Sequence, residues 1–323
     1  MLIATPATRL LGIRHPVLLA PMDLVADARL TAAVSAAGGL GILGGGDGDE
    51  EWLRRELDLL QHSGARFGVG FITWSLAKNP KLLDLALERK PTAVMLSSGD
   101  PAQFSEKVKR ADSVLICQVQ SLAFAKRRSG AGQISSLRRA QKVVVTGPHV
   151  AFFSLVPEMV DALDKKIPVV AAGGIADGRG LAAALTRGAS GVLMGTRFYA
   201  TQVSAGRDGA KAKIRAATGD DTLRSIVFDI SRRNIWPAPF TGRCLRNAHL
   251  DRWYAGEQDS EFGMKLHGKA PPRRHDSNAV HPARRGAQRP GLNPGLQPAR
   301  QQKRHAMPRA QAHERLLANR ERR

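Results

Sequence analysis

The chain has few of the features that would place it outside the cell or in a membrane. Only two cysteines, Cys117 and Cys244, occur among 323 residues, which is too few for a disulfide framework. No apolar run approaches the roughly 18 residues that a membrane-spanning helix needs. The first residues carry Arg9 and Arg14 and lack the apolar stretch of a signal peptide. These absences predict a cytoplasmic protein with no membrane segment.

Two kinds of ligand site are also missing from the sequence. His149, His267, His275 and His281 are scattered without ligand spacing, so no metal site is expected. Residues 44–46 form a glycine loop, but this loop lacks both the GxGxxG spacing and the adjacent helix start of a dinucleotide site. We therefore expect neither a metal nor a dinucleotide at these positions.

Acidic residues are scarce beside basic ones. There are 28 Asp and Glu against 49 Lys and Arg, which gives a formal net charge of +21. Two segments carry most of the excess, since residues 126–142 contribute +6 and residues 265–323 contribute +12. The rest of the chain is nearly balanced, which argues against a nucleic-acid-binding surface on the body of the protein.

What the chain does have is an alternation of short apolar runs with amphipathic stretches. Runs that are almost wholly apolar are typical of parallel strands buried on both faces, and eight right-handed βα units close into a barrel. We predict an α/β fold, a (β/α)₈ TIM barrel. The expected strands are 16–20, 39–43, 67–73, 92–98, 113–119, 168–172 and 190–194, with an eighth inside 129–150; the expected helices are 28–37, 50–60, 81–87, 101–109, 157–163 and 178–187.

Two neighbouring strands late in the chain end abruptly at glycine. Residues 168–175 read PVVAAGGI and residues 190–197 read SGVLMGTR. Missing side chains let backbone N–H groups approach an anion closely, and the last two βα loops of such a barrel are a frequent phosphate site. The residues expected to hold a cofactor phosphate are Gly173, Gly174, Gly195 and Thr196.

Several longer strings extend this pattern. They are LLAPMDLVADARLTAAVSAAGGLGILGGG, FGVGFITW, ICQVQS, LVPEMVDAL, PVVAAGGIADGRGLAAALTRGASGVLMGTRFYAT and PAPFTGRCLRNAHLDRWY, spread over residues 8–125 and 152–256. The combination of APM with AAGGIADGRG and MGTRF is specific to one group of proteins. These strings resemble the nitronate monooxygenase family, FMN-dependent barrels formerly called 2-nitropropane dioxygenases.

The resemblance implies FMN as cofactor, a nitronate or nitroalkane and O₂ as substrates, and a carbonyl compound and nitrite as products. It implies that Ala20, Pro21 and Met22 lie against the isoalloxazine ring and that Gln118 reaches the ring or the ribityl chain. Trp74 either lines the substrate pocket or caps the barrel, and Cys117 is expected to be inert core.

The family's catalytic segment cannot be found in the sequence. Family members carry a motif AQGxExGGHG at the sixth strand, whose histidine acts on the nitroalkane or nitronate; here residues 137–147 read LRRAQKVVVTG. Codons for this peptide can be chosen that spell AQGAESGGHG when read from the third base of the Leu137 codon. We therefore interpret residues 126–151 as a frameshifted segment, with a natural divergent sixth strand as the alternative. No catalytic residue is assigned, and low or no activity is expected.

The tail from about residue 265 onward is rich in Arg, Pro, Gln and Gly and has no periodicity, which predicts disorder. A shifted reading of residues 280–287 gives SIQRGEA, similar to a GEAV-like string of the family. The predicted domains are an FMN-binding barrel over residues 1–256, with an aberrant sixth strand, and a basic, disordered tail over 257–323. Two alternatives stay open: a related FMN-dependent enoyl-acyl carrier protein reductase, or a non-catalytic basic protein whose tail binds nucleic acid or acidic partners.

Overall fold

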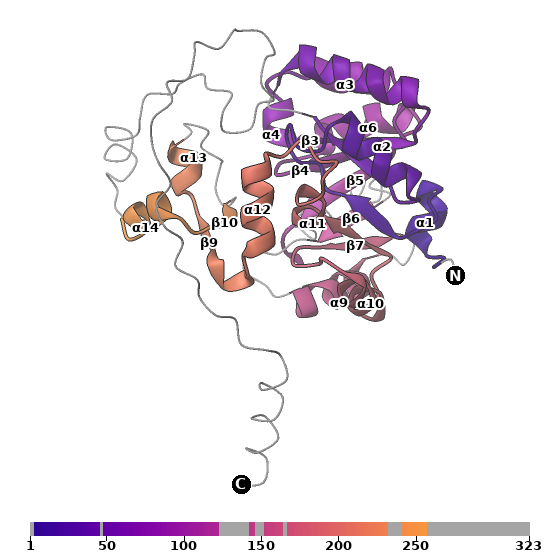
Figure 1. Cartoon of the computed structure of the whole chain (residues 1–323). Coiled ribbons are helices and arrows are strands. Elements are labelled where there is room, and N and C mark those ends of the chain that lie inside the picture. Colours follow the sequence, from indigo (N-terminus) through magenta and orange to yellow (C-terminus); the bar gives the residue numbers. More distant parts are fainter. Residues whose placement is uncertain are drawn as a thin grey trace, which may run out of the picture. The chain divides into compact units, whose positions relative to one another are not determined.

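Eight parallel strands form a closed barrel (Figure 1). The computed structural model describes residues 3–45, 48–122, 142–145, 152–163, 167–231 and 241–256. Neighbouring strands of the sheet stand in the order β1-β8-β7-β6-β5-β4-β3-β2. A parallel bridge between Leu18 of β1 and Leu40, the residue before β2, joins the two ends of this order and closes the sheet. The strands are β1 (Val17–Leu19), β2 (Gly41–Gly44), β3 (Phe67–Ile72), β4 (Ala93–Ser97), β5 (Val114–Val119), β6 (Lys142–Val145), β7 (Val169–Ala172) and β8 (Gly191–Met194). The predicted TIM barrel is thereby confirmed.

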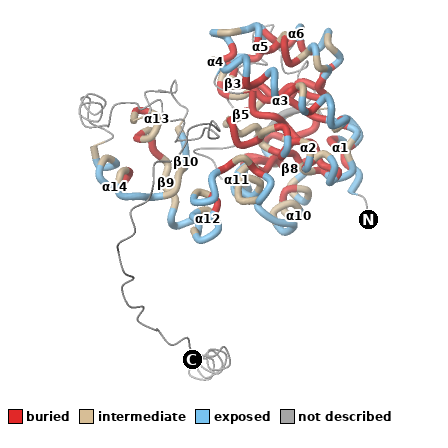
Figure 2. The backbone as a smooth tube through the Cα atoms, turned by 45° about the horizontal axis from the view of Figure 1, so that its top comes forward, coloured by how far each residue is buried: buried red, intermediate tan, exposed pale blue. Residues whose placement is uncertain are grey.

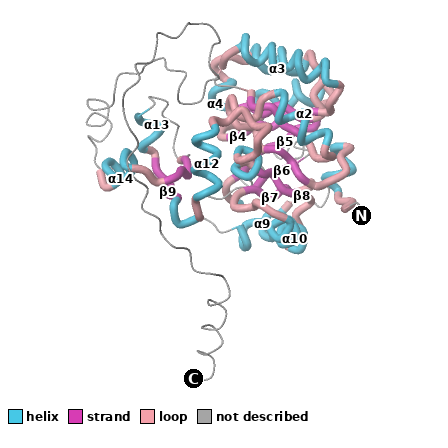
Figure 3. The backbone as a smooth tube through the Cα atoms, in the orientation of Figure 1, coloured by secondary structure: helices cyan, strands magenta, loops and turns pink. Residues whose placement is uncertain are grey.

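The helices lie around the strands (Figure 3), and five of the six predicted helices begin within one residue and end within three residues of the expected positions. Aspartates cap α2, α3 and α10: Asp27 accepts from the Leu30 N–H at 2.9 Å and Asp49 from the Trp52 N–H at 2.9 Å, as N-cap residues do, and Asp177 caps α10. The barrel helices are α1 (Pro6–Leu11), α2 (Ala28–Ala36), α3 (Glu50–Ser63), α4 (Thr73–Leu76), α5 (Lys81–Leu87), α6 (Ala102–Arg110), α9 (Phe152–Ala162), α10 (Gly178–Thr186), α11 (Thr196–Tyr199) and α12 (Asp208–Ala216).

Buried residues occur in most elements of the barrel (Figure 2), and their clusters include one inner set and one large outer set. The inner set comes almost entirely from strands, with Leu11 of α1 beneath them. The outer set joins the opposite faces of the strands to α3, α5, α6 and α9, and Cys117 belongs to it with 4% of its surface exposed. The expectation that Cys117 is core is confirmed. The inner set from the strands is Leu18, Leu40, Ile42, Ala93, Met95, Val114, Ile116, Val170, Ala172 and Leu193.

The strand β6 comes from the segment that the sequence marks as aberrant. Its residues pair in parallel with both neighbours, Gln118 opposite Val144 on one side and Val144 opposite Val170 on the other. β-branched residues suit a pleated, buried strand, so the sequence KVVV completes the barrel. The damage expected in the sixth strand therefore does not extend to its pairing. The rest of residues 126–151 lies outside the described residues.

The start of α9 differs from the prediction. The sequence pattern predicts a helix over residues 157–163, but the helix runs from Phe152 to Ala162 with Pro157 inside it. Proline removes the N–H that would bond the carbonyl four residues earlier, which here is Phe153. That carbonyl accepts a hydrogen bond from the Arg187 guanidinium instead. A side chain from α10's C-terminal end thus compensates for the proline.

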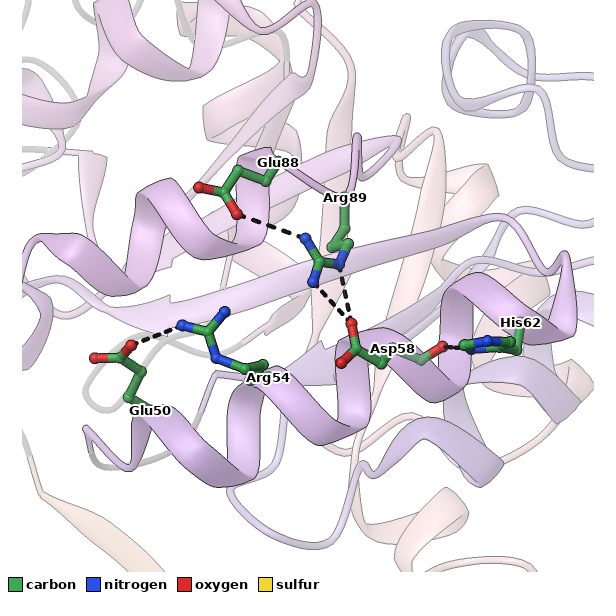
Figure 4. Close-up of polar contacts among 6 residues, drawn as sticks. All are labelled: Glu50, Arg54, Asp58, His62, Glu88 and Arg89. Atoms are coloured by element: carbon green, nitrogen blue, oxygen red, sulfur yellow. Dashed lines mark hydrogen bonds and ion pairs between the residues drawn. The ribbon is translucent and has the colours of Figure 1, made fainter.

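An ion pair joins α3 to the end of α5 on the outer side of the barrel (Figure 4). Both Nε and Nη2 of Arg89 donate to one carboxylate oxygen of Asp58, at 3.1 and 2.8 Å, and Nη1 lies 3.5 Å from Glu88. Arg54 pairs with Glu50 one turn away on α3 at 2.8 Å. Neighbouring helices on the same side of the sheet are thereby held together.

A small module follows the barrel. It contains a 3₁₀ turn (Gly219–Asp221), β9 (Thr222–Ser225), α13 (Val227–Ser231), β10 (Gly242–Leu245) and α14 (Ala248–Tyr254). β9 and β10 pair antiparallel, and Val227, Ile230 and Leu250 form its own apolar cluster. None of the described helices is long and apolar enough to span a membrane. The predicted tail, residues 257–323, lies outside the described residues.

Candidate functional site

Small or polar residues form the uppermost layer inside the barrel, at the carboxyl ends of the strands. Inner side chains recur every second residue, so the positions two residues beyond Leu18, Met95 and Ile116 continue the inner face. In place of another layer of large apolar side chains these positions carry glycine, alanine, serine or glutamine. This layer consists of Ala20, Gly44, Gly70, Ser97, Gln118 and Gly195. The apolar core therefore stops below the mouth of the barrel.

The loop after β1 crosses this mouth in a fixed conformation. The N–H of Ala20 donates to Met194 of β8 at 2.9 Å, and the carbonyl of Met22 accepts from Val25 and Ala26 at 3.1 and 2.8 Å. Leu24 is buried and has φ of 55°, a left-handed conformation that is costly for a non-glycine residue. The surrounding structure thus holds residues 20–26 in one arrangement.

Glycines in β2 and β3 make room for this loop. A Cβ on Gly70 would lie 2.4 Å from the Pro21 ring, and one on Gly44 would lie 2.6 Å from the Met22 carbonyl oxygen. Any side chain at either position would displace the loop. Pro21 and Met22 therefore lie close to β3 and β2. The lack of a side chain at Gly44 permits the close approach of the Met22 carbonyl.

The ends of β8 and β1 meet at Gly195. A Cβ on Gly195 would lie 3.5 Å from Cβ of Ala20 and 3.6 Å from Sδ of Met22, in ordinary van der Waals contact. Gly195 precedes Thr196, the first residue of α11, and the first N–H groups of a helix have no acceptor within it. Four of the predicted cofactor residues, Ala20, Met22, Gly195 and Thr196, are thus brought together.

The turn after β7 consists of two successive glycines in left-handed conformations. Gly173 has φ of 98° and Gly174 has φ of 70°, and no atom of the described residues lies within 4 Å of where their Cβ atoms would be. Both residues are exposed. Because only glycine adopts such a conformation readily, the sequence GG specifies a bare backbone turn. That turn leaves the backbone without covering side chains at the end of β7, the strand that pairs with β8.

The start of α10 is already occupied by a carboxylate. Asp177 accepts from the N–H groups of Arg179 and Gly180 at 3.0 and 3.1 Å, and the Arg179 guanidinium binds the same carboxylate at 2.8 and 2.5 Å. The guanidinium, followed by the Gly180 amide, lowers the pKa of Asp177 below its usual value. An anion at this end of the barrel would therefore have to be bound by the glycine turns that follow β7 and β8, and not by the start of α10.

Gln118 and Ser97 lie on neighbouring strands of the same upper layer. Gln118 is half-buried in β5, and the Ser97 hydroxyl donates to the Phe71 carbonyl at 3.2 Å. The structure thus places the predicted residue Gln118 on the inner face. Ser97 was not predicted as a site residue, although the alternation in TAVMLSS indicates that it faces inward.

Trp74 follows β3 in α4, and Nζ of Lys78 lies 4.6 Å from the centre of its ring. This cation–π contact is local and does not decide between a pocket wall and a cap. Among the described residues no group of three His, Cys, Asp or Glu could hold a metal ion. His149, His267, His275 and His281 lie outside the described residues.

Comparison with known proteins bears on this arrangement. The nitronate monooxygenase family model matches residues 4–146 and 76–241. The chain belongs to the nitronate monooxygenase family. Its fold is therefore the α/β barrel of a flavin-dependent oxidoreductase family.

Individual relatives agree with the family. The chain is 32% identical over 301 residues to a nitronate monooxygenase of Neurospora crassa, with 78% of this chain and 79% of the relative covered. It is 36% identical over 234 residues to a (3aS,4S,5R,7aS)-5-hydroxy-7a-methyl-1-oxo-octahydro-1H-indene-4-carboxyl-CoA dehydrogenase of Rhodococcus jostii, covering 70% of this chain and 63% of that protein. FabK from Thermotoga maritima has a similar structure, with a TM-score of 0.69, 31% identity, and coverage of 82% and 81%.

Proposed function

We propose that the mouth of the barrel binds FMN. Gly173, Gly174, Gly195 and Thr196 would supply backbone N–H groups to the phosphate, and Ala20, Pro21, Met22 and Gln118 would contact the ring and ribityl chain. The proposal rests on the pair of left-handed glycines, whose Cβ positions no described residue approaches within 4 Å, and on Gly195, where a Cβ would lie within van der Waals distance of Ala20 and Met22. A bare turn beside a layer of small residues fits a phosphate joined to a flat ring.

We propose further that the reaction is the family's: oxidation of a nitronate or nitroalkane by O₂ to a carbonyl compound and nitrite. FMN, when bound, would supply the redox chemistry. The chain's part is to orient the ring through residues 20–22, for which Gly70 and Gly44 leave room. The apolar layer beneath, including Leu18, Met95 and Ile116, keeps water away from one side of the site.

Proton abstraction is where this chain departs from its family. The motif that carries the catalytic histidine is missing from residues 137–147. Since general acid–base catalysis contributes typically 10²–10⁴-fold, we expect flavin binding with little turnover. Membership of the family therefore does not by itself give this chain the family's catalytic activity.

Sequencing of the encoding DNA across codons 120–155 and 255–323 tests the frameshift interpretation. Compensating single-base errors that restore AQGAESGGHG would make this an ordinary family member. If the printed sequence stands, a gene with compensating single-base changes flanking codons 126–151 provides the matched comparison. Nitrite release and O₂ uptake from 2-nitropropane should rise at least about 100-fold in the restored protein. Equal rates in the two proteins would contradict the assignment of catalysis to that motif.

Flavin binding is measured separately from turnover. Titration of FMN, followed by fluorescence quenching, should saturate at one equivalent in both proteins. Failure of both proteins to bind FMN would contradict the proposed site itself.

A second candidate is an FMN-dependent enoyl-acyl carrier protein reductase, and the likeness to FabK supports keeping it. Such an enzyme needs a nicotinamide nucleotide as reductant. Oxidation of NADH that depends on an enoyl thioester, without nitrite release from nitroalkanes, would favour this candidate over the first.

A further inference from the structure

A lysine is buried where α12 meets the segment that precedes it. Lys211 of α12 has only 5% of its surface exposed, whereas lysine is almost never buried unless it is paired. Its Nζ donates to the carbonyl oxygens of Ser204 and Gln202 at 2.8 and 3.2 Å and lies 3.7 Å from a carboxylate oxygen of Asp208. The ammonium thus supplies charge-assisted hydrogen bonds to two carbonyls of residues 200–206, the segment between α11 and α12.

Residues 200–206 fold back onto α11. The hydroxyl of Ser204 donates to the carbonyl of Tyr199, the last residue of α11, at 2.7 Å, and it accepts from the N–H of Gly206 at 3.3 Å. A Cβ on Gly206 would lie 2.5 Å from Cε1 of the Tyr199 ring. The segment is therefore in close contact with the short helix that begins at Thr196.

The same segment also contacts the loop after β1. The N–H of Ala205 donates to the carbonyl of Val25 at 3.3 Å. Phe198 of α11 and Met22 of that loop pack against one apolar cluster, which includes Ala26. Residues 200–206 therefore connect the two sides of the candidate site, namely the loop that would contact the ring and the helix start that would bind the phosphate.

The charge of Lys211 extends to the end of this loop. Burial raises the pKa of Asp27, the N-cap of α2, and the charge of Lys211 is among the effects that lower it in part. Asp27 follows Val25 by two residues, so the ammonium lies near the point where the loop after β1 passes into α2.

We propose that Lys211 is a positioning residue of the flavin site. Its bonds to Gln202 and Ser204 hold residues 200–206 in the path that brings Ala205 to Val25, and the loop after β1 is held in turn. Lys211 acts through these two segments and not through a contact of its own with the cofactor. The inference rests on the proposed binding of FMN at the mouth of the barrel.

The variant Lys211→Met tests this role, because it keeps an unbranched side chain of similar length and removes the ammonium. The carbonyls of Gln202 and Ser204 then lose their donor, which is costly for buried groups. In the full-length protein the affinity for FMN, measured by fluorescence titration, should fall at least about tenfold. Lys213→Met is the matched control, because Lys213 is exposed on the same helix; it should bind FMN like the parent.

The variant Asp208→Asn separates the carbonyl bonds of Lys211 from its ion pair. The Asp208 side chain is fully exposed and lies 3.7 Å from Nζ, and such exposed ion pairs contribute little. Asp208→Asn should therefore bind FMN like the parent. A loss of affinity as large as that in Lys211→Met would assign the effect to the ion pair and overturn the proposal.

Hydrogen exchange, followed by mass spectrometry on the FMN-free protein, shows whether the effect passes from one segment to the other. Lys211→Met should exchange faster than the parent at residues 200–206 and at residues 20–26, and like the parent in β4 and β5. Faster exchange at residues 200–206 alone would overturn the proposal. An equal increase throughout the barrel would also overturn it, since it would show a general loss of stability.

The flavin spectrum distinguishes failure of this inference from failure of the proposed function. At saturating FMN, the absorption band of the bound ring should differ from that of the parent in Lys211→Met and not in Lys213→Met. A parent that does not bind FMN contradicts the flavin site, and the exchange measurement still decides whether Lys211 holds the loop after β1. Equal affinities and equal spectra in the parent and Lys211→Met contradict the role of Lys211 and leave the flavin site standing.

Discussion

The guanidinium of Arg187 donates a hydrogen bond to the carbonyl oxygen of Phe153, the acceptor that Pro157 leaves without an amide. Its Cζ also lies 5.3 Å from the centre of the Phe153 ring. We expect Arg187→Ala to lower the free energy of unfolding by about 1–2 kcal/mol. Urea denaturation followed by circular dichroism measures this loss.

The proline provides the control for that prediction. In a Pro157→Ala background the amide of residue 157 can bond the Phe153 carbonyl itself. Removal of Arg187 should therefore cost clearly less there than in the parent. If the cost is the same in both backgrounds, the two groups do not share that acceptor.

The glycine turn after β7 gives a prediction about the cofactor. Gly174→Ala places a side chain on a residue with φ of 70°, a conformation that costs L-residues roughly 1–2 kcal/mol. Relaxation of the turn would misalign its amides, so we expect FMN affinity to fall at least about tenfold. Fluorescence titration of FMN measures the change.

Gly178 is the matched control for that experiment. No described residue lies within 4 Å of its Cβ position either, but its φ is not in the left-handed range. Gly178→Ala should bind FMN like the parent. An equal loss in both variants would mean that the bare turn has no specific role in FMN binding.

The contact between Gly70 and Pro21 predicts a different kind of failure. A Cβ on Gly70 would meet the Pro21 ring at 2.4 Å, whereas one on Gly195 would rest at 3.5 Å from Ala20. Overpacking of this kind costs typically 1–3 kcal/mol. Thermal unfolding should show Gly70→Ala clearly destabilised and Gly195→Ala close to the parent. The reverse order would contradict the described path of residues 20–22.

The sequence predicts most of the barrel, since each strand and its following helix are local patterns. The helix over Lys81–Leu87 begins and ends where expected, and β7 and β8 end at the predicted glycines. The start of α9 could not be predicted in this way. It depends on Arg187, thirty-odd residues further along the chain, which supplies what Pro157 lacks.

The candidate site shows the same limit. Glycine-rich strand ends indicate Gly173, Gly174 and Gly195, but the reason for Gly70 is the ring of Pro21 in the loop after β1. In the module that follows the barrel, the sequence likewise marks Arg224 and Arg243 only as two charges among many. They are cross-strand partners because of the register in which β9 and β10 pair. No short turn joins these two strands, so the sequence alone does not predict that register.

Two N-cap aspartates should respond to pH in opposite directions. Burial raises the pKa of Asp27 above its usual 3.8, although the Leu30 amide and the charges of Arg29 and Lys211 lower it in part. The folded protein therefore holds this proton more tightly than the unfolded chain. The resulting stabilisation is present below pH 3.8 and is lost as the pH rises through the folded pKa. For Asp177, whose pKa is lowered by Arg179, the stabilisation is present above 3.8 and lost in acid.

Asparagine also caps helices well, so Asp→Asn variants change the charge and keep the cap. At pH 7 we expect Asp27→Asn to unfold at the same or a higher urea concentration than the parent, with the difference disappearing toward pH 3.5. Asp177→Asn should be less stable than the parent at pH 7 and should converge with it in acid. Urea titrations between pH 3.5 and 8 measure both. If Asp27→Asn loses stability at neutral pH as Asp177→Asn does, the carboxylate of Asp27 is stabilised by Lys211 and Arg29 more than it is opposed by its burial.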